Sequence, residues 1–354
     1  MIYVHVPYCR SFCKYCDFYS ERSAPRSSFV DEICREIALR RDEIKASEAI
    51  DTLYFGGGTP SVLPLPYLER IASACGKNSY REWTMEVNPD DITPEYAAGL
   101  AALGVNRVSM GVQSLDDALL GWMNRRHDAA GARRAFDALR GAGFGNISTD
   151  LIFGISGLTA QMLRSTLEGL LQWRPEHISA YQLSVEEGSA LGRLAAKGRY
   201  REMEDSACRM QYELICRTLA EAGYEHYEIS NWALPGFRAV HNSAYWTRAP
   251  YAGFGPGAHS LRIDGALQVR SWNSQRLSGW TGESETLTAE EIRTERIMLG
   301  LRTADGVEAS LLPEGAAEEC RLAASELPGR LRIPEENFFV SDDIISTILS
   351  IFAI

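Results

Sequence analysis

Short runs with the composition of β-strands alternate with amphipathic stretches through the first half of the sequence. The runs begin near Ile2, Asp51, Trp83, Arg107, Asn146 and His177. Such alternation is typical of repeated βα units on a parallel sheet. Six units predict an α/β fold, an incomplete (β/α)6 barrel of the TIM type, in which the functional site lies at the carboxyl ends of the strands.

Polar residues recur late in these strand-like runs. In the third and fourth runs polar or small residues alternate with apolar ones and lead to Glu86 and Gln113, and Asp150 interrupts the apolar fifth run. Period-2 alternation places such residues on one face of a strand. Each residue alone also fits a strand end that bonds to a loop. Their common position in successive strands favours a shared site facing the lumen.

The first loop holds three cysteines, Cys9, Cys13 and Cys16, in the pattern C-x-x-x-C-x-x-C. Thiolates bind zinc, copper(I) or iron–sulfur clusters. A structural zinc takes a fourth ligand, and the position that would offer one in a C-x-x-C-x-C run is Phe18. Three thiolates suit a [4Fe–4S] cluster with one iron open to an outside ligand. A distorted zinc loop and three unrelated thiols are the alternatives.

A glycine run, Gly56-Gly57-Gly58-Thr59-Pro60, follows the second strand-like run. Glycine lets the backbone come close to a ligand. Clusters of glycine and proline mostly mark turns, so the signal is weak alone. It gains weight because the run lies one strand after the cysteine loop.

Charge and hydropathy restrict the classes of partner. The formal net charge of -11 argues against nucleic acid. The N-terminus resembles a strand rather than a signal peptide, and the sequence has no apolar stretch long enough to cross a bilayer. With five of its eight cysteines scattered, the chain is expected to be a reducing, cytoplasmic protein. Oligomeric state and peripheral contact with a membrane stay open.

The sequence divides into three parts. Residues 1–223 form the predicted barrel, and residues 224–284, rich in tyrosine, tryptophan, glycine and histidine, form a closing segment packed on it. Residues 285–354 show a helix, a strand-turn-strand stretch at 331–340 and a last helix, which resembles a small winged-helix-like module. In the first predicted helix, Ser28 and Asp31 suggest a capping box.

An ordered set of motifs resembles the radical S-adenosylmethionine (SAM) superfamily and, within it, the oxygen-independent coproporphyrinogen III oxidase group. The motifs lie at residues 5–9, 16–18, 54–61, 86–89, 104–114, 150–154 and 177–182. The resemblance extends to about residue 305 and implies a (β/α)6 partial barrel with a helical C-terminal module.

The resemblance also implies cofactors and their ligands. Cys9, Cys13 and Cys16 would hold a [4Fe–4S] cluster whose open iron is chelated by SAM. The positions that match family contacts to SAM or its surroundings are Tyr3, Tyr15, Gly57, Gly58, Thr59, Glu86, Gln113, Arg125 and Asp150. Ser156 and Leu158 depart from the family pattern in the fifth loop.

Two branches of the group differ near the cysteines. The oxidases carry the pattern C-x-x-x-C-x-x-C-x-C after an N-terminal extension. This sequence has Phe18 at the position of the fourth cysteine and begins eight residues before Cys9. It resembles instead the HemW branch of haem chaperones, and the segment from His241 through Tyr245 to Trp246 matches that branch's H-N-x-x-Y-W signature. Neutral imidazole is a good ligand for haem iron, and flanking aromatic rings can cover a porphyrin face. The alternative is a loop histidine with two core aromatics.

The resemblance therefore implies a haem chaperone that binds a [4Fe–4S] cluster, SAM and haem, and delivers haem to an apo-haemoprotein. The alternative is an enzyme that decarboxylates coproporphyrinogen III to protoporphyrinogen IX with a SAM-derived radical. Radical chemistry on another substrate is a third hypothesis, because a barrel by itself does not specify a substrate.

Overall fold

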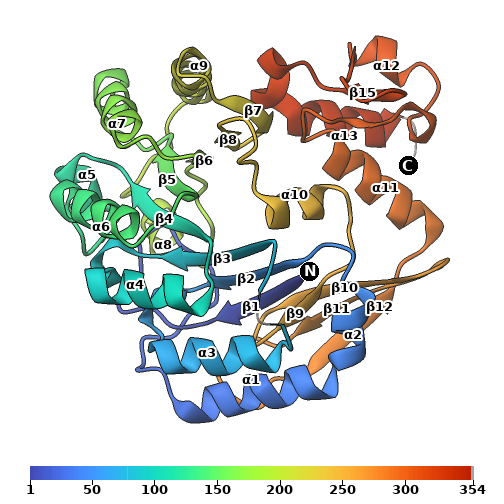
Figure 1. The fold of residues 1–354 in the computed structure, drawn as a ribbon. Coiled ribbons are helices and arrows are strands. Elements are labelled where there is room, and N and C mark those ends of the chain that lie inside the picture. Colours follow the sequence, from blue (N-terminus) through green and yellow to red (C-terminus); the bar gives the residue numbers. More distant parts are fainter. Residues whose placement is uncertain (78, 352–354) are drawn as a thin grey trace.

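The computed structural model describes residues 1–77 and 79–351 (Figure 1). Six parallel strands lie side by side in chain order: β1 (Ile2–Val6), β2 (Thr52–Gly57), β3 (Glu82–Val87), β4 (Arg107–Gln113), β5 (Ile147–Phe153) and β6 (His177–Gln182). Each begins within one residue of a predicted position. The predicted α/β fold of six βα units is confirmed.

Helices cover the outer face of this curved sheet (Figure 1). They are α1 (Ser27–Leu39), α3 (Leu65–Ala74), α4 (Pro94–Leu103), α6 (Ala129–Gly141), α7 (Ala160–Trp173) and α9 (Asp205–Glu221), with the shorter α2 (Arg41–Ala46) and α5 (Asp117–Trp122). The short α8 (Ala190–Ala195) lies instead against the first loop, at the carboxyl ends of the strands. The apolar faces of the covering helices and the outward residues of the strands form one core cluster. Burial of that apolar surface is the main stabilising contribution to the fold.

The predicted capping box of α1 is wrong. The helix begins at Ser27 after Arg26, and no side chain caps it. Ser28 is already helical, so it cannot take the extended backbone of an N-cap residue. Asp31 instead forms an ion pair with Arg70 on α3, in which Oδ1 of Asp31 lies 2.6 Å from Nη2 of Arg70.

The segment 224–284 adds strands at both ends of the sheet. At one end, β7 (Glu225–Glu228) and β8 (Asn231–Ala233) form a hairpin whose second strand pairs antiparallel with β6. At the other end, β9 (Ala252–Phe254) pairs parallel with β1. β10 (His259–Asp264), β11 (Leu267–Asn273) and β12 (Gly282–Thr286) then form a separate antiparallel sheet. Among the described residues the two edge strands of the large sheet do not pair, as in a partial barrel.

The helix α10 (Val240–Trp246) lies on the concave side of the large sheet (Figure 1). The carboxylate of Glu82, at the start of β3, accepts hydrogen bonds from the backbone N–H groups of Val240 and His241, both at 2.8 Å. A negative charge at a helix N-terminus is favourable because it meets unpaired N–H groups. The helix therefore fills the lumen near the amino ends of the strands and leaves the carboxyl ends open.

The C-terminal part is a small module of helices and a three-stranded sheet. It contains α11 (Ala289–Gly300), β13 (Val307–Glu308), α12 (Ala316–Glu319), β14 (Ala323–Ala324), β15 (Arg330–Arg332) and α13 (Ser341–Ile351). The strand-turn-strand prediction for residues 331–340 is wrong in its second half, where Glu335–Val340 forms a 3-10 helix. Pro334 stands before it and has no N–H for a strand ladder.

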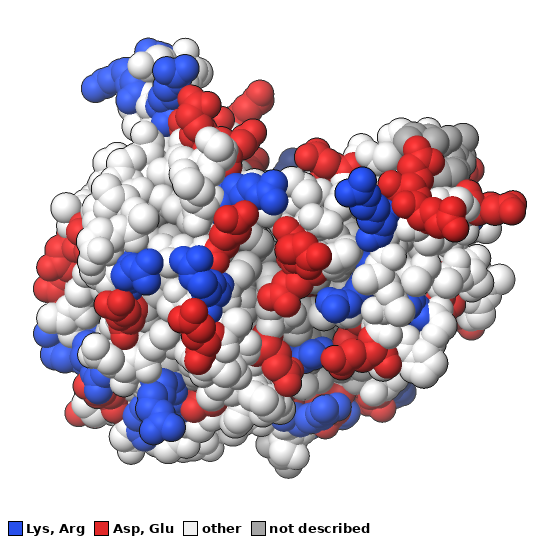
Figure 2. Space-filling view, turned by 90° about the horizontal axis from the view of Figure 1, so that it is seen from above, with Lys and Arg blue, Asp and Glu red and all other residues white. Residues whose placement is uncertain are grey.

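Figure 2 shows one face of the molecule, on which acidic and basic side chains are interspersed. Exposed pairs such as Arg133 with Asp137 (2.9 Å) contribute little to stability. Of the helices that the structure describes, none is both long enough and apolar enough to span a membrane.

Candidate functional site

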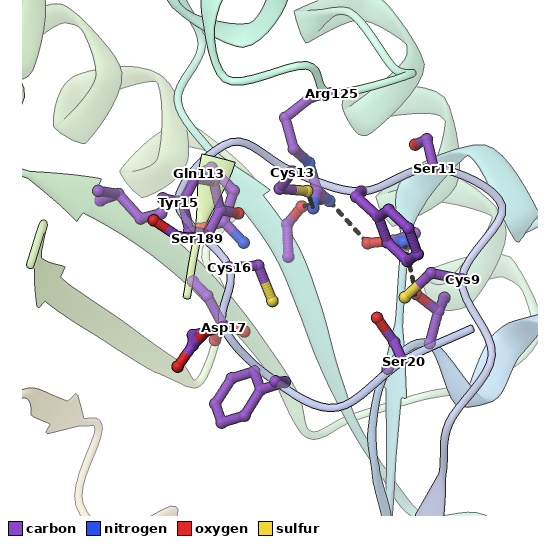
Figure 3. Close-up of a pocket in the computed structure, with 18 of the residues that line it drawn as sticks. Cys9, Ser11, Cys13, Tyr15, Cys16, Asp17, Ser20, Gln113, Arg125 and Ser189 are labelled. Atoms are coloured by element: carbon purple, nitrogen blue, oxygen red, sulfur yellow. Dashed lines mark hydrogen bonds between the residues drawn. The ribbon is translucent and has the colours of Figure 1, made fainter. Parts of the chain in front are cut away.

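A cavity of about 930 Å³ lies at the carboxyl ends of the parallel strands (Figure 3). The first loop and the ends of strands β2 to β6 line it. The structure thus brings Glu86, Gln113 and Asp150, from three successive strands, to one cavity.

The three loop cysteines line the same cavity (Figure 3). The Sγ atom of Cys9 lies 3.3 Å from Oγ1 of Thr59, and Nη1 of Arg125 donates to Sγ of Cys13 at 3.4 Å. Within residues 1–77 and 79–351, no three His, Cys, Asp or Glu side chains converge closely enough to hold one metal ion. In a [4Fe–4S] cube each thiolate binds a different iron atom, so three cysteine ligands of a cluster do not share one point.

The electrostatic surroundings of the thiols are mixed. Burial raises the pKa of Cys9, and it raises the pKa of Cys16 to about 11. Thiolates are the form that binds metal, and a bound cation or a neighbouring positive charge favours them. The guanidinium of Arg125, beside Cys13, supplies such a charge within the protein.

Glu86 presents a carboxylate to the cavity and is held on both oxygens. Its Oε1 accepts from the hydroxyl of Tyr54 at 2.7 Å, and its Oε2 accepts from the N–H of Gly57 at 3.2 Å. Burial, with the charge of Asp150 as a further contribution, raises the pKa of Glu86 to about 7. The group can therefore accept or donate a hydrogen bond toward a ligand near neutral pH.

The glycine run passes so close to neighbouring residues that side chains would not fit there. A Cβ atom on Gly57, which has φ of 108°, would lie 2.6 Å from the ring of His5. A Cβ atom on Gly58 would lie 2.9 Å from the backbone oxygen of Tyr8. The backbone thus passes close to β1, and Gly57 and Gly58 line the large cavity without side chains.

Gln113 carries an unused acceptor. It follows a bulge in β4 and has φ of 68°, a region that residues other than glycine seldom occupy. Its Oε1 atom is buried and has no hydrogen-bond partner in the described part of the chain. Asp150, on the next strand, is fixed by the hydroxyl of Ser109 at 3.1 Å. Buried acceptors are normally satisfied, so the oxygen of Gln113 fits a ligand that donates an N–H or O–H group, and the carboxylate of Asp150 lines the same cavity.

Asn88 links the glycine run to Arg125, a role that the sequence alone did not indicate. Its Nδ2 donates to Thr59 Oγ1 at 3.1 Å, and its Oδ1 accepts from Nη2 of Arg125 at 2.7 Å. Arg125 also donates to the backbone oxygen of Gly111 at 2.7 Å. The period-2 relation of Asn88 to Glu86 was the signal that could have identified it.

The two tyrosines that the resemblance assigned to the SAM site lie apart. Tyr15 lines the large cavity. Tyr3 lines a neighbouring cavity of about 380 Å³, where its hydroxyl lies 3.2 Å from Nδ1 of His5.

The residues that the sequence assigned to haem belong to α10. His241 is buried, with Nδ1 2.8 Å from Thr52 Oγ1 and Nε2 3.1 Å from the Tyr245 hydroxyl. Burial lowers its pKa to about 3, so its ring is neutral. Tyr245 lines the neighbouring cavity, and Trp246 is half-buried at the end of the helix.

Residues 3–170 match the model of the radical SAM superfamily. The chain is 34% identical to heme chaperone HemW of Lactococcus lactis, over 86% of this chain and 82% of that protein. It is 32% identical to heme chaperone HemW of Mycobacterium tuberculosis, over 98% and 94% of the two chains. Among solved structures, coproporphyrinogen III oxidase (HemN) from Escherichia coli superposes with a TM-score of 0.79 at 18% identity, over 99% of this chain and 90% of that one. At that identity the superposition shows a shared fold.

Proposed function

Because the chain belongs to the HemW family of the radical SAM superfamily, we propose that it is a haem chaperone that binds haem and delivers it to an apo-haemoprotein. The observation that carries the proposal is the extent of the sequence identity with HemW proteins, which covers nearly the whole chain. The likeness to HemN is one of fold, and a fold hosts many functions.

Membership of the radical SAM superfamily implies a [4Fe–4S] cluster and SAM. In the proposal Cys9, Cys13 and Cys16 hold the cluster, which supplies one electron and one open iron position when bound. The three thiols line one cavity, and Arg125 offsets the charge of the thiolate at Cys13. Because iron binds reduced thiolates, a reducing compartment such as the cytoplasm suits this assignment.

The SAM assignment uses the unused polar groups of the large cavity. Gln113 offers an unpartnered oxygen, Asp150 a carboxylate fixed by Ser109, and Glu86 a carboxylate fixed by Tyr54. The glycine run gives a wall without side chains. Asn88 bonds to both Thr59 and Arg125. The glycine run and the guanidinium of Arg125 are therefore positioned relative to each other. Tyr15 lines the same cavity, whereas Tyr3 lines the neighbouring one and belongs to the proposed set only through the resemblance.

For haem, the sequence points to His241, Tyr245 and Trp246. In the structure His241 would have to release Thr52 or Tyr245 before a ring nitrogen could bind iron, whereas Tyr245 already faces a cavity. In this proposal residues 1–223 carry the cluster and SAM, residues 224–284 carry haem ligands, and residues 285–354 form a separate C-terminal module.

Anaerobic reconstitution with iron and sulfide followed by two parallel assays tests the function. One assay follows transfer of haem from the loaded protein to an apo-haemoprotein by the Soret spectrum, and the other follows conversion of coproporphyrinogen III to protoporphyrinogen IX. We expect haem transfer without decarboxylation. Decarboxylation without haem transfer would establish the oxidase instead.

A matched pair of cysteine variants tests the cluster assignment. Replacing Cys9, Cys13 and Cys16 together by alanine should abolish the visible absorbance of the cluster and its iron content. Cys320→Ala, in the C-terminal module, should leave both unchanged. Equal iron content in the two proteins would contradict the assignment.

A further inference from the structure

The cavity of about 380 Å³ that adjoins the SAM site has walls unlike those of its neighbour. It shares Asp17, Phe18, Gly57 and Glu86 with the large cavity, so the two lie on opposite sides of these residues. Its remaining lining includes the aromatic side chains Tyr3, Tyr19, Tyr245 and Tyr251. Its volume lies within the usual range of ligand pockets, roughly 300–1,000 Å³. Asp17, Glu86 and Gln275 add polar groups, so the cavity suits a flat ligand that packs its face on the tyrosine rings and carries polar groups at its edge.

His259 lies on this cavity because of the turn between β9 and β10. β9 runs parallel to β1, so the turn emerges at the carboxyl rim of the sheet, the same rim that carries the cysteine loop. A side chain at Gly253 would collide with the backbone of His259, and one at Gly255, with φ of 93°, would lie 2.7 Å from the His5 backbone oxygen. The glycines therefore let the chain turn back close to β1 and place His259 on the cavity.

The hydrogen bonds of the six histidines single out His259. The other five each hold at least one ring nitrogen in a hydrogen bond within the protein, namely His5, His127, His177, His226 and His241. His259 is exposed, and within the described residues neither of its ring nitrogens has a hydrogen-bond partner. Partial burial, with the charge of Arg270 as a smaller contribution, lowers the pKa of its ring and favours the neutral form. A neutral imidazole with a free nitrogen is what iron binds.

The ring of His259 is held by packing instead. His259 pairs with Trp272 across β10 and β11, and the two rings stack with centroids 6.2 Å apart at 29°. Cross-strand pairs of this kind stabilise a sheet and restrict the side-chain rotamer. The imidazole is thus oriented without the use of either nitrogen.

Phe18 lies on the same cavity and is 72% exposed, although it is a large apolar side chain. It stands two residues after Cys16, in the loop that separates the two cavities. An aromatic ring at the mouth of an aromatic cavity can cover one face of a planar ligand and gain burial when the ligand binds.

We propose that this second cavity holds haem and that His259 is an axial ligand of its iron. The inference rests on the proposed chaperone function and goes beyond it, since it assigns the ligand to the β9–β10 turn rather than to α10. His241 then acts as a buried support between Thr52 and Tyr245. An exposed ligand at a cavity mouth suits a cargo that has to leave again.

Titration of the protein with hemin, followed by Soret absorbance and by electron paramagnetic resonance, tests this assignment. The variants are His259→Ala, His259→Gln and His241→Ala, with Asp264→Ala at the far end of β10 as a control for the strand. We expect His259→Ala and His259→Gln to bind hemin at least tenfold more weakly and to lose the spectrum of histidine ligation. Added imidazole should restore that spectrum in His259→Ala. Asp264→Ala should keep the wild-type affinity and spectrum. His241→Ala removes a buried support of Tyr245, so it should weaken hemin binding but keep the spectrum of histidine ligation.

The outcomes separate this inference from the function on which it rests. If the wild-type protein binds no haem, the chaperone proposal fails and the ligand assignment fails with it. If wild type binds haem and His259→Ala shows the same affinity and spectrum, only the assignment to His259 fails. A thiolate-type spectrum in wild type would also overturn it and point to a cysteine. Circular dichroism of each variant, together with the imidazole rescue, separates loss of the ligand from loss of the fold.

Discussion

Substitution of Gly57 by alanine tests the glycine wall of the large cavity. Gly57 has φ of 108°, and an L-residue in that region loses about 1–2 kcal/mol. The added Cβ would lie 2.6 Å from the ring of His5. That ring is fixed by the Tyr3 hydroxyl and the Tyr19 carbonyl, both at 3.2 Å, so displacing it costs about 1–3 kcal/mol more. We expect Gly57→Ala to lower the free energy of unfolding by about 2–5 kcal/mol.

Gly143→Ala is a matched control. Gly143 has φ of 94°, and no atom lies within 4 Å of a Cβ placed there. Only the backbone contribution of about 1–2 kcal/mol should appear. Urea unfolding followed by circular dichroism gives both free energies, and their difference isolates the collision with His5. If Gly57→Ala is no less stable than Gly143→Ala, the close approach of the glycine run to β1 is wrong. SAM binding to the reconstituted proteins should be lost in Gly57→Ala and kept in Gly143→Ala.

Three further substitutions test other parts of the structure. Burial raises the pKa of Glu228 to about 8 from an ordinary value of 4.5. Between about pH 5 and about pH 8 the folded state therefore holds a proton that the unfolded state has lost, and the free energy of unfolding should fall as the pH rises through this range. Glu228→Gln should flatten that fall in urea titrations, and an equally steep fall in the variant would contradict this. Asn88→Ala frees Thr59 and Arg125 and should weaken SAM binding about tenfold in calorimetry without changing iron content, whereas unchanged affinity would remove Asn88 from the site. Asp116→Ala removes the side-chain cap of α5 and should lower the free energy of unfolding by about 1 kcal/mol, which the same urea assay measures.

The six central strands could be predicted because parallel strands are buried on both faces and appear as short apolar runs between amphipathic helices. The same regularity allowed Glu86, Gln113 and Asp150 to be grouped, since equivalent positions in neighbouring parallel strands end at one rim. Thr288 and Glu291 form a capping box at the start of α11, as their spacing suggests. These features depend on residues that are close in sequence or repeat with a fixed period.

The short strands of residues 224–284 could not be predicted in the same way. β8 and β9 are three residues long, too short for a period of two to be recognised. Their position depends on pairing with β6 and β1, at separations that no local pattern encodes. The capping box expected at Ser28 failed for a related reason. The residue type was suitable, but the helix begins one residue earlier, at Ser27, so Ser28 is inside its first turn.

The two candidate haem ligands show what a sequence pattern leaves undecided. His241 was identified because it belongs to a recognisable motif with Tyr245, and in the fold its ring bonds to Thr52 of β2, which helps to hold the helix inside the lumen. His259 ends the glycine-rich run 253–259 of the closing segment, for which the sequence indicated no ligand role, yet no described residue bonds to its ring nitrogens and it lies on an aromatic cavity. That cavity forms only when β9 pairs with β1 across some 250 residues of chain. Whether a histidine nitrogen can bind iron depends on the tertiary hydrogen bonds of its ring. The structure, rather than the residue type, therefore distinguishes His259 from His241 as a ligand.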